Sequence, residues 1–174
     1  MLGLFLVLVT AHAGQVCMSN GWVVEWTISD TKIDLSITID EDTRTNKDWV
    51  SVGIETEKLM TDMMVYYIDG IAEDWHTDVQ HKEPKSDVSN GGTDDVTGES
   101  WDDSKNKFSW SKLLNTGDSR DLSLIEGGNY NLICNSGLVD ADGLVEGPYG
   151  LKKTLLKEIV LSNDFSSGCT TEVY

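Results

Sequence analysis

The sequence predicts an all-β protein, an antiparallel β-sandwich of roughly nine or more strands. Short runs rich in β-branched and aromatic residues recur at close spacing along the 174 residues, and turn residues separate them. The run from Lys32 to Ile39 alternates between apolar and polar residues, as a half-buried antiparallel strand does. No long amphipathic helical pattern interrupts these runs.

The N-terminus has the pattern of a secretory signal peptide. An apolar run from Leu2 to Val9 is followed by the small residues Ala11 and Ala13. This run is too short to span a bilayer, and no other segment is apolar enough to do so. We therefore expect a secreted protein in which residues 1–13 are the signal peptide. Residues 14–174 are then expected to form a single domain, with a core at about 21–161.

The expected strands follow one another closely in the mature chain. They are residues 21–28, 32–39, 49–54, 63–68, 71–78, 96–101, 107–110, 129–135 and 153–161. A charged loop is expected at 40–48, a long polar surface loop at 79–95, and a turn-rich link at 112–121.

The most specific local signal is a β-hairpin centred on Asp69-Gly70. These two residues tolerate the positive φ angles of a type I′ turn, and apolar runs lie on both sides of them. Because side chains alternate along a strand, one face should hold three residues of the run and the other face the remaining three. The first set is Met64, Tyr66 and Ile68, and the second is Met63, Val65 and Tyr67.

The charge of the chain excludes several classes of partner. Lys and Arg total 13 against 30 Asp and Glu, a formal net charge of −17. Such a surface repels phosphate, so nucleic acid and anionic membranes are not expected partners. The carboxylates chiefly predict a solvated acidic surface. Asp140, Asp142 and Glu146 give only a weak calcium signal, because the EF-hand pattern is absent.

Three cysteines remain in the expected mature chain. Cys17 and Cys169 lie just outside the terminal strands, and chain termini are often close in space, so we expect a disulfide between them. Cys134 lies within an apolar run and is expected to be a buried free thiol.

Several segments together resemble the DOMON domain family. They are the strand Trp49–Ile54, the loop Met60–Asp62, the turn Asp69-Gly70, the segment Lys112–Asp121 and the strand Tyr130–Gly137. The segment Lys112–Asp121 is similar to the family pattern R-x-L-x-T-G-D-x-x-D, with Lys in place of the usual Arg. The resemblance covers about residues 21–161 and implies an immunoglobulin-like β-sandwich.

The resemblance also implies extracellular ligand binding, with haem b or sugars as the ligand classes. Met60 matches the methionine that holds haem iron in the cytochrome members. Between Ser136 and Leu161, where their histidine ligand lies, this sequence has no His. His76 or Tyr149 could replace it only in a differently arranged pocket. We therefore expect no haem, and we expect Asp62 to fix loop geometry by accepting backbone N–H bonds.

Aromatic side chains can stack on sugar rings, and two of them flank the long polar loop. We expect partial exposure of Trp75 and Trp101, and solvent exposure of His76. The candidate ligand-binding residues are Met60, Asp62, Tyr66, Trp75, His76 and Trp101.

No arrangement of catalytic nucleophile and base occurs in the sequence. The sequence therefore predicts a non-catalytic module that binds a carbohydrate or another small ligand at one end of the sandwich. One alternative is a haem b electron-transfer domain with Met60 as an axial ligand. A second alternative is an extracellular structural or assembly subunit that contacts a protein partner.

Overall fold

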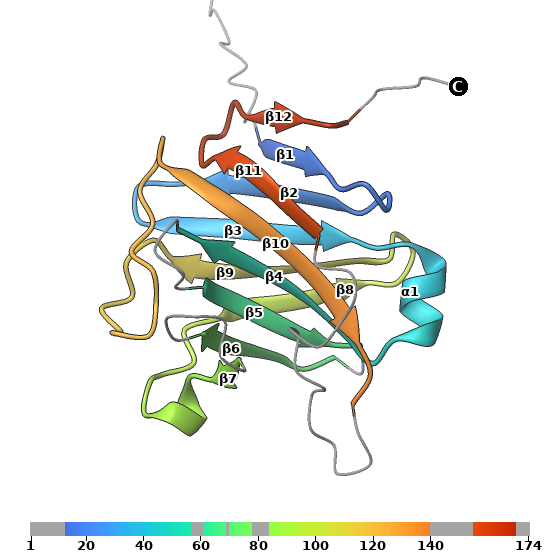
Figure 1. Ribbon diagram of the computed structural model, residues 1–174, viewed down its shortest axis with the longest axis horizontal. Helices are drawn as coiled ribbons and strands as arrows, with labels where there is room; N and C mark the ends of the chain where they lie inside the picture. Colours follow the sequence, from blue (N-terminus) through green and yellow to red (C-terminus); the bar gives the residue numbers. More distant parts are fainter. Residues whose placement is uncertain (1–12, 57–60, 69, 78–83, 140–154, 170–174) are drawn as a thin grey trace, which may run out of the picture.

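Two six-stranded β-sheets face each other in the computed structural model, which describes residues 13–56, 61–68, 70–77, 84–139 and 155–169 (Figure 1). Sheet A has the strand order β12 (Ser166–Ser167), β1 (Gly14–Cys17), β2 (Val23–Ile28), β3 (Lys32–Thr38), β9 (Lys107–Leu113) and β8 (Thr97–Asp102). Sheet B has the order β11 (Leu155–Val160), β10 (Asn129–Gly137), β4 (Trp49–Glu55), β5 (Thr61–Tyr67), β6 (Ala72–Thr77) and β7 (Lys85–Ser86). The predicted all-β sandwich is confirmed.

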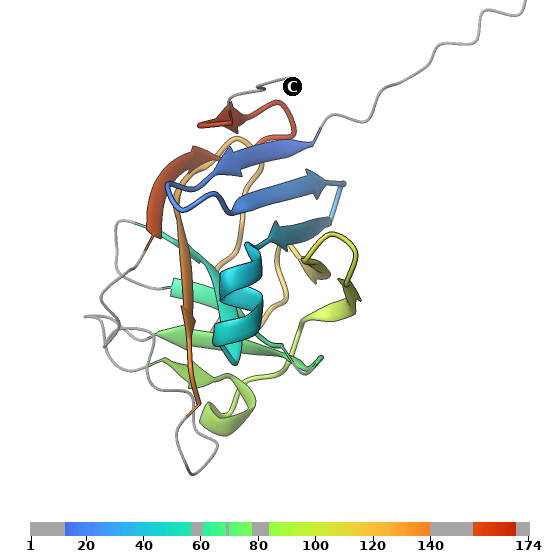
Figure 2. The same ribbon diagram turned by 90° about the vertical axis from the view of Figure 1, so that its right-hand side faces the viewer.

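The two sheets form two layers around the main hydrophobic core (Figure 2). Alternate residues of each strand point into this core, because successive side chains of a strand lie on opposite faces. Trp26 and Phe108 are among the largest fully buried side chains from sheet A, and Leu132 is among those from sheet B. Apart from the parallel pair β1–β12, the strand pairs of the described residues are antiparallel.

The predicted central hairpin is confirmed. Strands β5 and β6 pair antiparallel, and Gly70 has a φ of 109°, which an L side chain rarely adopts. Met64 and Tyr66 join the main core, whereas Met63, Val65 and Tyr67 join a second apolar cluster with Trp49. The two faces therefore divide as expected. Asp69 and residues 78–83 lie outside the described residues.

The predicted cysteine pairing is also confirmed. Cys17 and Cys169 form a disulfide with a Cα–Cα separation of 4.9 Å. The bridge joins the ends of the chain next to the paired strands β1 and β12. Cys134 is buried and free, and burial raises the pKa of its thiol well above its usual range.

The prediction of a charged loop at 40–48 was wrong, because this segment contains the helix α1 (Glu41–Asn46). The Asp40 side chain accepts a hydrogen bond from the Thr43 backbone N–H and so caps the helix. Glu41 and Asp42 lie in the first turn and Arg44 in the last, which complements the helix dipole. The helix lies at one end of the sandwich (Figure 1).

The prediction of a polar surface loop at 79–95 was also partly wrong. Within its described part, residues 84–95, the chain forms β7 and the short 3₁₀ helix η1 (Val88–Asn90). Between these two elements lies Asp87, whose side chain is fully buried. This segment is therefore partly an integral piece of the fold rather than a surface loop.

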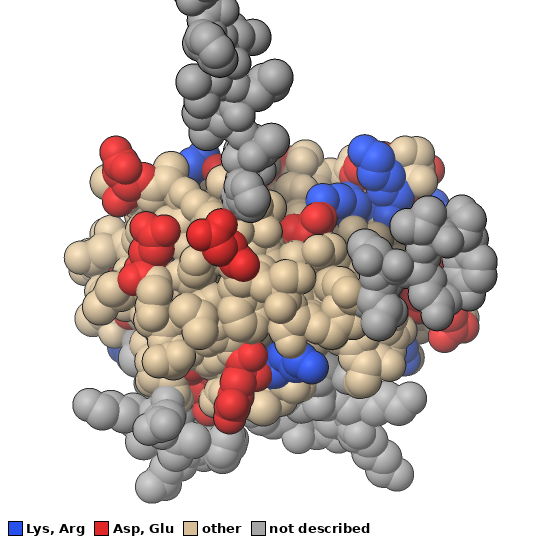
Figure 3. Space-filling model, turned by 90° about the horizontal axis from the view of Figure 1, so that it is seen from above, with Lys and Arg blue, Asp and Glu red and all other residues tan. Residues whose placement is uncertain are grey.

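The charged surface has no single dominant patch on the face seen in Figure 3. Asp and Glu side chains are scattered there among uncharged residues, and a few Lys and Arg side chains lie between them. This distribution fits a solvated acidic surface, which is what the net charge predicts.

Candidate functional site

The interior of the sandwich contains an ionic cluster centred on a lysine. The Lys112 ammonium lies 2.8 Å from Asp62 Oδ1, 2.9 Å from Asp74 Oδ2 and 2.8 Å from Asp121 Oδ1. All four side chains are buried or nearly so. We call Lys112, Asp62, Asp74 and Asp121 the lysine cluster.

Three strands and the link that follows one of them bring the lysine cluster together. Asp62 lies on β5 and Asp74 on β6, and the pairing of these strands places both side chains on the inner face of sheet B. Lys112 reaches them from the inner face of β9 in sheet A. Asp121 follows from the link after β9, where the Thr116 hydroxyl donates a hydrogen bond to it. The segment Lys112–Asp121, which carries the family pattern, thus ties the two sheets together.

Asp62 also performs the role that the resemblance implied. Its Oδ2 accepts a hydrogen bond of 3.0 Å from the Leu122 backbone N–H, just after Asp121. Its ion pair with Lys112 was not predicted, because that contact joins residues 50 positions apart. Asp62 therefore contributes to the framework of the fold.

A second buried group adjoins the lysine cluster. The Asp87 carboxylate Oδ1 lies 2.7 Å from His76 Nδ1, and Asn90 Nδ2 lies 3.0 Å from His76 Nε2. His76 is 3% exposed, so the expectation of a solvent-exposed histidine was wrong. The reason is its position on β6 opposite Asp62, which turns the imidazole to the inner face of the sheet.

The buried groups carry more negative than positive charge. Burial raises the pKa of Asp74 to about 8, although Lys112 acts to lower it. Burial and, after it, the nearby Asp121 carboxylate together raise the pKa of Asp87 to about 7. Asp87 Oδ2 accepts no hydrogen bond, which suits a protonated oxygen that donates to Asp121. For Lys112, burial lowers the pKa, but the Asp62 and Asp74 carboxylates outweigh it and raise the pKa.

These pKa shifts predict that the protein loses stability as the pH rises from about 4 to 8. Asp74 and Asp87 hold their protons to higher pH in the folded state than in the unfolded state, where the pKa is 3.8. Their contribution is complete below the unfolded pKa and is lost as the pH passes the folded values. Urea unfolding at pH 5 and pH 8 should give the higher free energy of unfolding at pH 5.

The matched variant for this prediction is Asp87→Asn. An amide keeps an acceptor for His76 and offers a permanent donor to Asp121, but it does not titrate. The decline in stability between pH 5 and pH 8 should be smaller in this variant. An equal decline in both proteins would contradict the assignment of Asp87.

The lysine cluster has the ligand chemistry of a cation site, since oxygens of its three carboxylates lie within 4.8 Å of one another. The Lys112 ammonium, however, bonds to all three carboxylates at once. The ammonium therefore stands where a metal ion would bind, and we assign the cluster a role in the framework of the fold.

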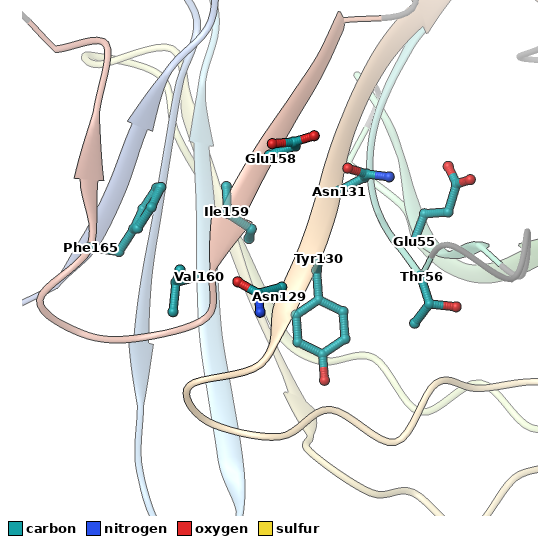
Figure 4. A pocket seen from close by; sticks show the side chains of 9 residues that line it. All are labelled: Glu55, Thr56, Asn129, Tyr130, Asn131, Glu158, Ile159, Val160 and Phe165. Atoms are coloured by element: carbon teal, nitrogen blue, oxygen red, sulfur yellow. The ribbon is translucent and has the colours of Figure 1, made fainter.

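A different site lies at the end of sheet B, where β4 and β11 end and β10 begins (Figure 4). It is an open cleft with a volume of about 840 Å³. It is lined by Glu55, Thr56, Asn129, Tyr130, Asn131, Glu158, Ile159, Val160 and Phe165.

Strand register determines the polar side of this cleft. Asn131 of β10 pairs with Glu55 of β4 on one side and with Glu158 of β11 on the other. Paired residues point to the same face of a sheet, so the three side chains form a row across three strands (Figure 4). We call Glu158, Asn131 and Glu55 the polar row.

Aromatic and apolar side chains complete the cleft. The Tyr130 hydroxyl accepts a hydrogen bond from the Ile125 backbone N–H, which fixes the ring at the start of β10. Phe165 stacks on Trp26, with 5.9 Å between the ring centroids. The cleft therefore combines amides, a hydroxyl and carboxylates with aromatic rings held by the core.

The structure separates most of the candidate ligand-binding residues. Trp75 is half-buried on the outer face of sheet B, and its indole N–H donates to Glu73. Tyr66 is buried in the core, where it stacks on Phe108 and on the half-buried Trp101. Trp75, Tyr66 and Trp101 do not line the cleft. Met60, Asp140, Asp142, Glu146 and residues 1–12 of the expected signal peptide lie outside the described residues.

Sequence reasoning missed Glu55, Asn131 and Glu158 as site residues. Each is one polar residue in a strand, and such residues usually face solvent. It also missed Asp74, which lies in the expected strand 71–78, and Asp87, which lies in the expected polar loop 79–95. The pattern Lys112–Asp121 did contain two members of the lysine cluster, but nothing in its spacing identified their partners.

The fold and site define an all-β sandwich module with a tethering ionic cluster and an open cleft at one end. The sequence model of the DOMON domain matches residues 18–137, more than half of the chain, and the chain therefore belongs to the DOMON domain family. The chain matches none of the curated proteins with which it was compared. DOMON domains are generally non-catalytic and of extracellular type. Within the described residues, no helix has the length and apolar character needed to cross a bilayer.

The described residues do not fit the haem ligation known in this family. His76 is the single histidine within the described ranges, and both of its ring nitrogens are engaged by Asp87 and Asn90 inside the sandwich. A second axial ligand cannot come from this imidazole without breaking those contacts.

Proposed function

We propose that this chain is a secreted, non-catalytic DOMON module that binds a carbohydrate in the cleft of Figure 4. The observation that carries the proposal is the composition of the cleft wall. Side-chain amides, carboxylates and a hydroxyl stand beside aromatic rings in a volume of about 840 Å³. This volume is within the range of small-ligand sites, roughly 300–1,000 Å³.

The cleft wall suits the chemistry of sugars. Each hydroxyl of a sugar both donates and accepts hydrogen bonds, and an Asn amide offers both functions to it. Carboxylates accept from two neighbouring hydroxyls and make stronger bonds than neutral acceptors do. The apolar faces of sugar rings require flat apolar surfaces, and the half-buried Phe165 offers one at this end of the sandwich, whereas Tyr130 is buried in the core.

The test is binding of soluble oligosaccharides to the purified mature protein. We expect at least one oligosaccharide in an immobilised glycan panel to bind, with confirmation by isothermal titration calorimetry. Asn131→Ala should weaken that binding by about tenfold, since it removes one or two hydrogen bonds. Asn46→Ala is the matched control, because Asn46 is exposed on α1 and does not line the cleft. No binding across the panel, or equal loss in both variants, would refute the proposal.

We also expect the protein to bind no stoichiometric haem. The described histidine is engaged within the fold, and Met60 alone does not supply two axial ligands. Expression with ample haem should give a purified protein with no Soret band. A sharp Soret band that shifts on reduction and weakens in Met60→Ala would instead support the electron-transfer alternative.

A further inference from the structure

One buried side chain anchors a largely exposed segment at the edge of sheet B. The segment from Lys85 to Asp95 contains β7 and η1 and lies beyond β6 (Figure 1). Among residues 85–95, all of which the structure describes, Asp87 is the single buried residue, whereas Val88 is 62% exposed. We call residues 85–95 the edge segment.

Few backbone contacts hold the edge segment to the sandwich. Strand β7 pairs with β6 at two positions only. The Asp87 backbone N–H donates to the Asp74 carbonyl oxygen at 2.9 Å, and the Asp95 backbone N–H donates to Asp74 Oδ2 at 3.2 Å. A third bond joins the Thr93 backbone N–H to Asp118 Oδ2 at 2.6 Å. The attachment of the segment therefore depends strongly on the buried Asp87 side chain.

The two oxygens of the Asp87 carboxyl group have different surroundings. Oδ1 lies 2.7 Å from His76 Nδ1 and is paired. Oδ2 is buried and receives no hydrogen bond from a donor group, and its neighbour is the carboxyl group of Asp121. Two carboxylates in contact repel each other unless one of them carries a proton. The attached segment thus requires a proton between Asp87 and Asp121.

The charged groups around Asp87 do not remove this requirement. They are Asp74 and His76 of β6, Asp62 of β5, Lys112 of β9, and Arg120 and Asp121 of the link after β9. The Lys112 ammonium has three hydrogens, and it donates them to the three aspartates of the lysine cluster. The Arg120 guanidinium donates to the Asn90 carbonyl oxygen at 3.2 Å. Carboxylates therefore dominate the surroundings of Asp87.

We propose that the edge segment is a pH-dependent strap, which lies closed on the sandwich while Asp87 and Asp121 share one proton and separates when both carboxylates are ionised. On separation the proton passes to solvent, and the Asp87 carboxylate becomes hydrated. The imidazole of His76, which is 3% exposed in the closed form, then becomes accessible to water. This device is independent of the proposed carbohydrate binding, because the cleft lies next to β11 at the opposite edge of sheet B.

The sign of the pH dependence follows from proton linkage. The pKa of Asp87 is about 7 in the closed form, and it returns toward 3.8 when the side chain enters water. Separation therefore releases a proton at pH values between these two, and acid favours the closed form. The ratio of separated to closed molecules should rise by up to about tenfold per pH unit from about pH 4 to 7 and then become constant.

The experiment is amide hydrogen exchange of the purified protein, resolved by residue with NMR, at pH 4.5 and pH 6.5. Protection factors are compared, because they correct for the intrinsic pH dependence of exchange. We expect the protection of the Asp87 and Asp95 amides to fall by about tenfold or more between the two pH values. Amides of β3 and β9 should remain more strongly protected at both, since they report opening of the core.

Two variants identify the titrating group. Asp87→Asn keeps an acceptor for His76 and a permanent donor for Asp121, so it should abolish most of the pH dependence. Asp118→Asn is the matched control. Asp118 also holds the segment, but hydrogen bonds from the Arg120 and Thr93 backbone N–H groups lower its pKa. Because Asp118 is ionised at both pH values, this control should lower protection by a similar factor at each.

Three outcomes would overturn the proposal. The first is equal protection of the Asp87 and Asp95 amides at pH 4.5 and pH 6.5. The second is a decrease that the amides of β3 and β9 share in full, because the segment would then open only when the whole protein unfolds. The third is an undiminished pH dependence in Asp87→Asn. The first two comparisons use the protein with its native sequence and do not require that a variant folds.

Discussion

Replacing Lys112 by Met is expected to destabilise the protein by about 3–5 kcal/mol, the usual loss when a buried ion pair is left without one partner. The ammonium bonds to Asp62, Asp74 and Asp121, which all remain buried after the substitution. Methionine fills much of the same volume but neutralises none of these carboxylates. Urea unfolding at pH 7 should show a much lower midpoint than the unchanged protein, or no folded state.

The matched control for this prediction lies on the same strand. Lys107 also forms an ion pair, with Glu25 at 2.6 Å, but both side chains are partly exposed on the outer face of sheet A. Lys107→Met should therefore cost at most about 1 kcal/mol. The loss of stability in Lys112→Met should be smaller at pH 5, because protonation removes the negative charge of carboxylates that no longer have a cationic partner. Similar losses in the two variants would show that the lysine cluster does not hold the sheets together.

Loss of the Cys17–Cys169 disulfide is expected to cost about 4–5 kcal/mol, because the bridge closes a very long loop in the unfolded chain. The two residues are 152 positions apart in sequence. The double variant Cys17→Ser, Cys169→Ser should unfold at a much lower urea concentration. The reduced form of the unchanged protein should behave like the double variant.

Cys134→Ala is the control for the disulfide. This variant removes the buried free thiol but keeps the bridge, so it should lose only the packing of one sulfur atom. Its unfolding midpoint should still fall when a reductant is added. If the reductant does not lower the unfolding midpoint of the protein with its native sequence, the bridge does not have a stabilising role.

Local patterns in the sequence determined much of the fold. Alternation over residues 32–39 predicted β3, and the Asp69-Gly70 turn predicted the pairing of β5 with β6. These signals are local because strand period and turn geometry depend on adjacent residues. The helix α1 was missed although its signal was also local, since Asp40 and the acidic first turn mark a helix start. Its six residues are too few to show a helical period.

Tertiary structure alone decided which polar residues belong together. The partners of Lys112 lie 50, 38 and 9 positions away in sequence, and no spacing rule connects them. His76 was expected in solvent because a polar stretch follows it, but its strand position opposite Asp62 buried it. Which face a polar residue takes depends on strand register, and register is set by pairing across the sheet.

The candidate cleft shows the same difference between what the sequence determines and what only the tertiary structure decides. The sequence by itself determined that the chain is a β-sandwich with the pattern of the DOMON family, because alternation, turns and motif order are written in consecutive residues. Only the tertiary structure placed Glu55, Asn131 and Glu158 side by side, since they come from three strands separated by 76 and 27 positions in sequence. A site built across a sheet is defined by cross-strand neighbours, and sequence order does not specify which strands become neighbours.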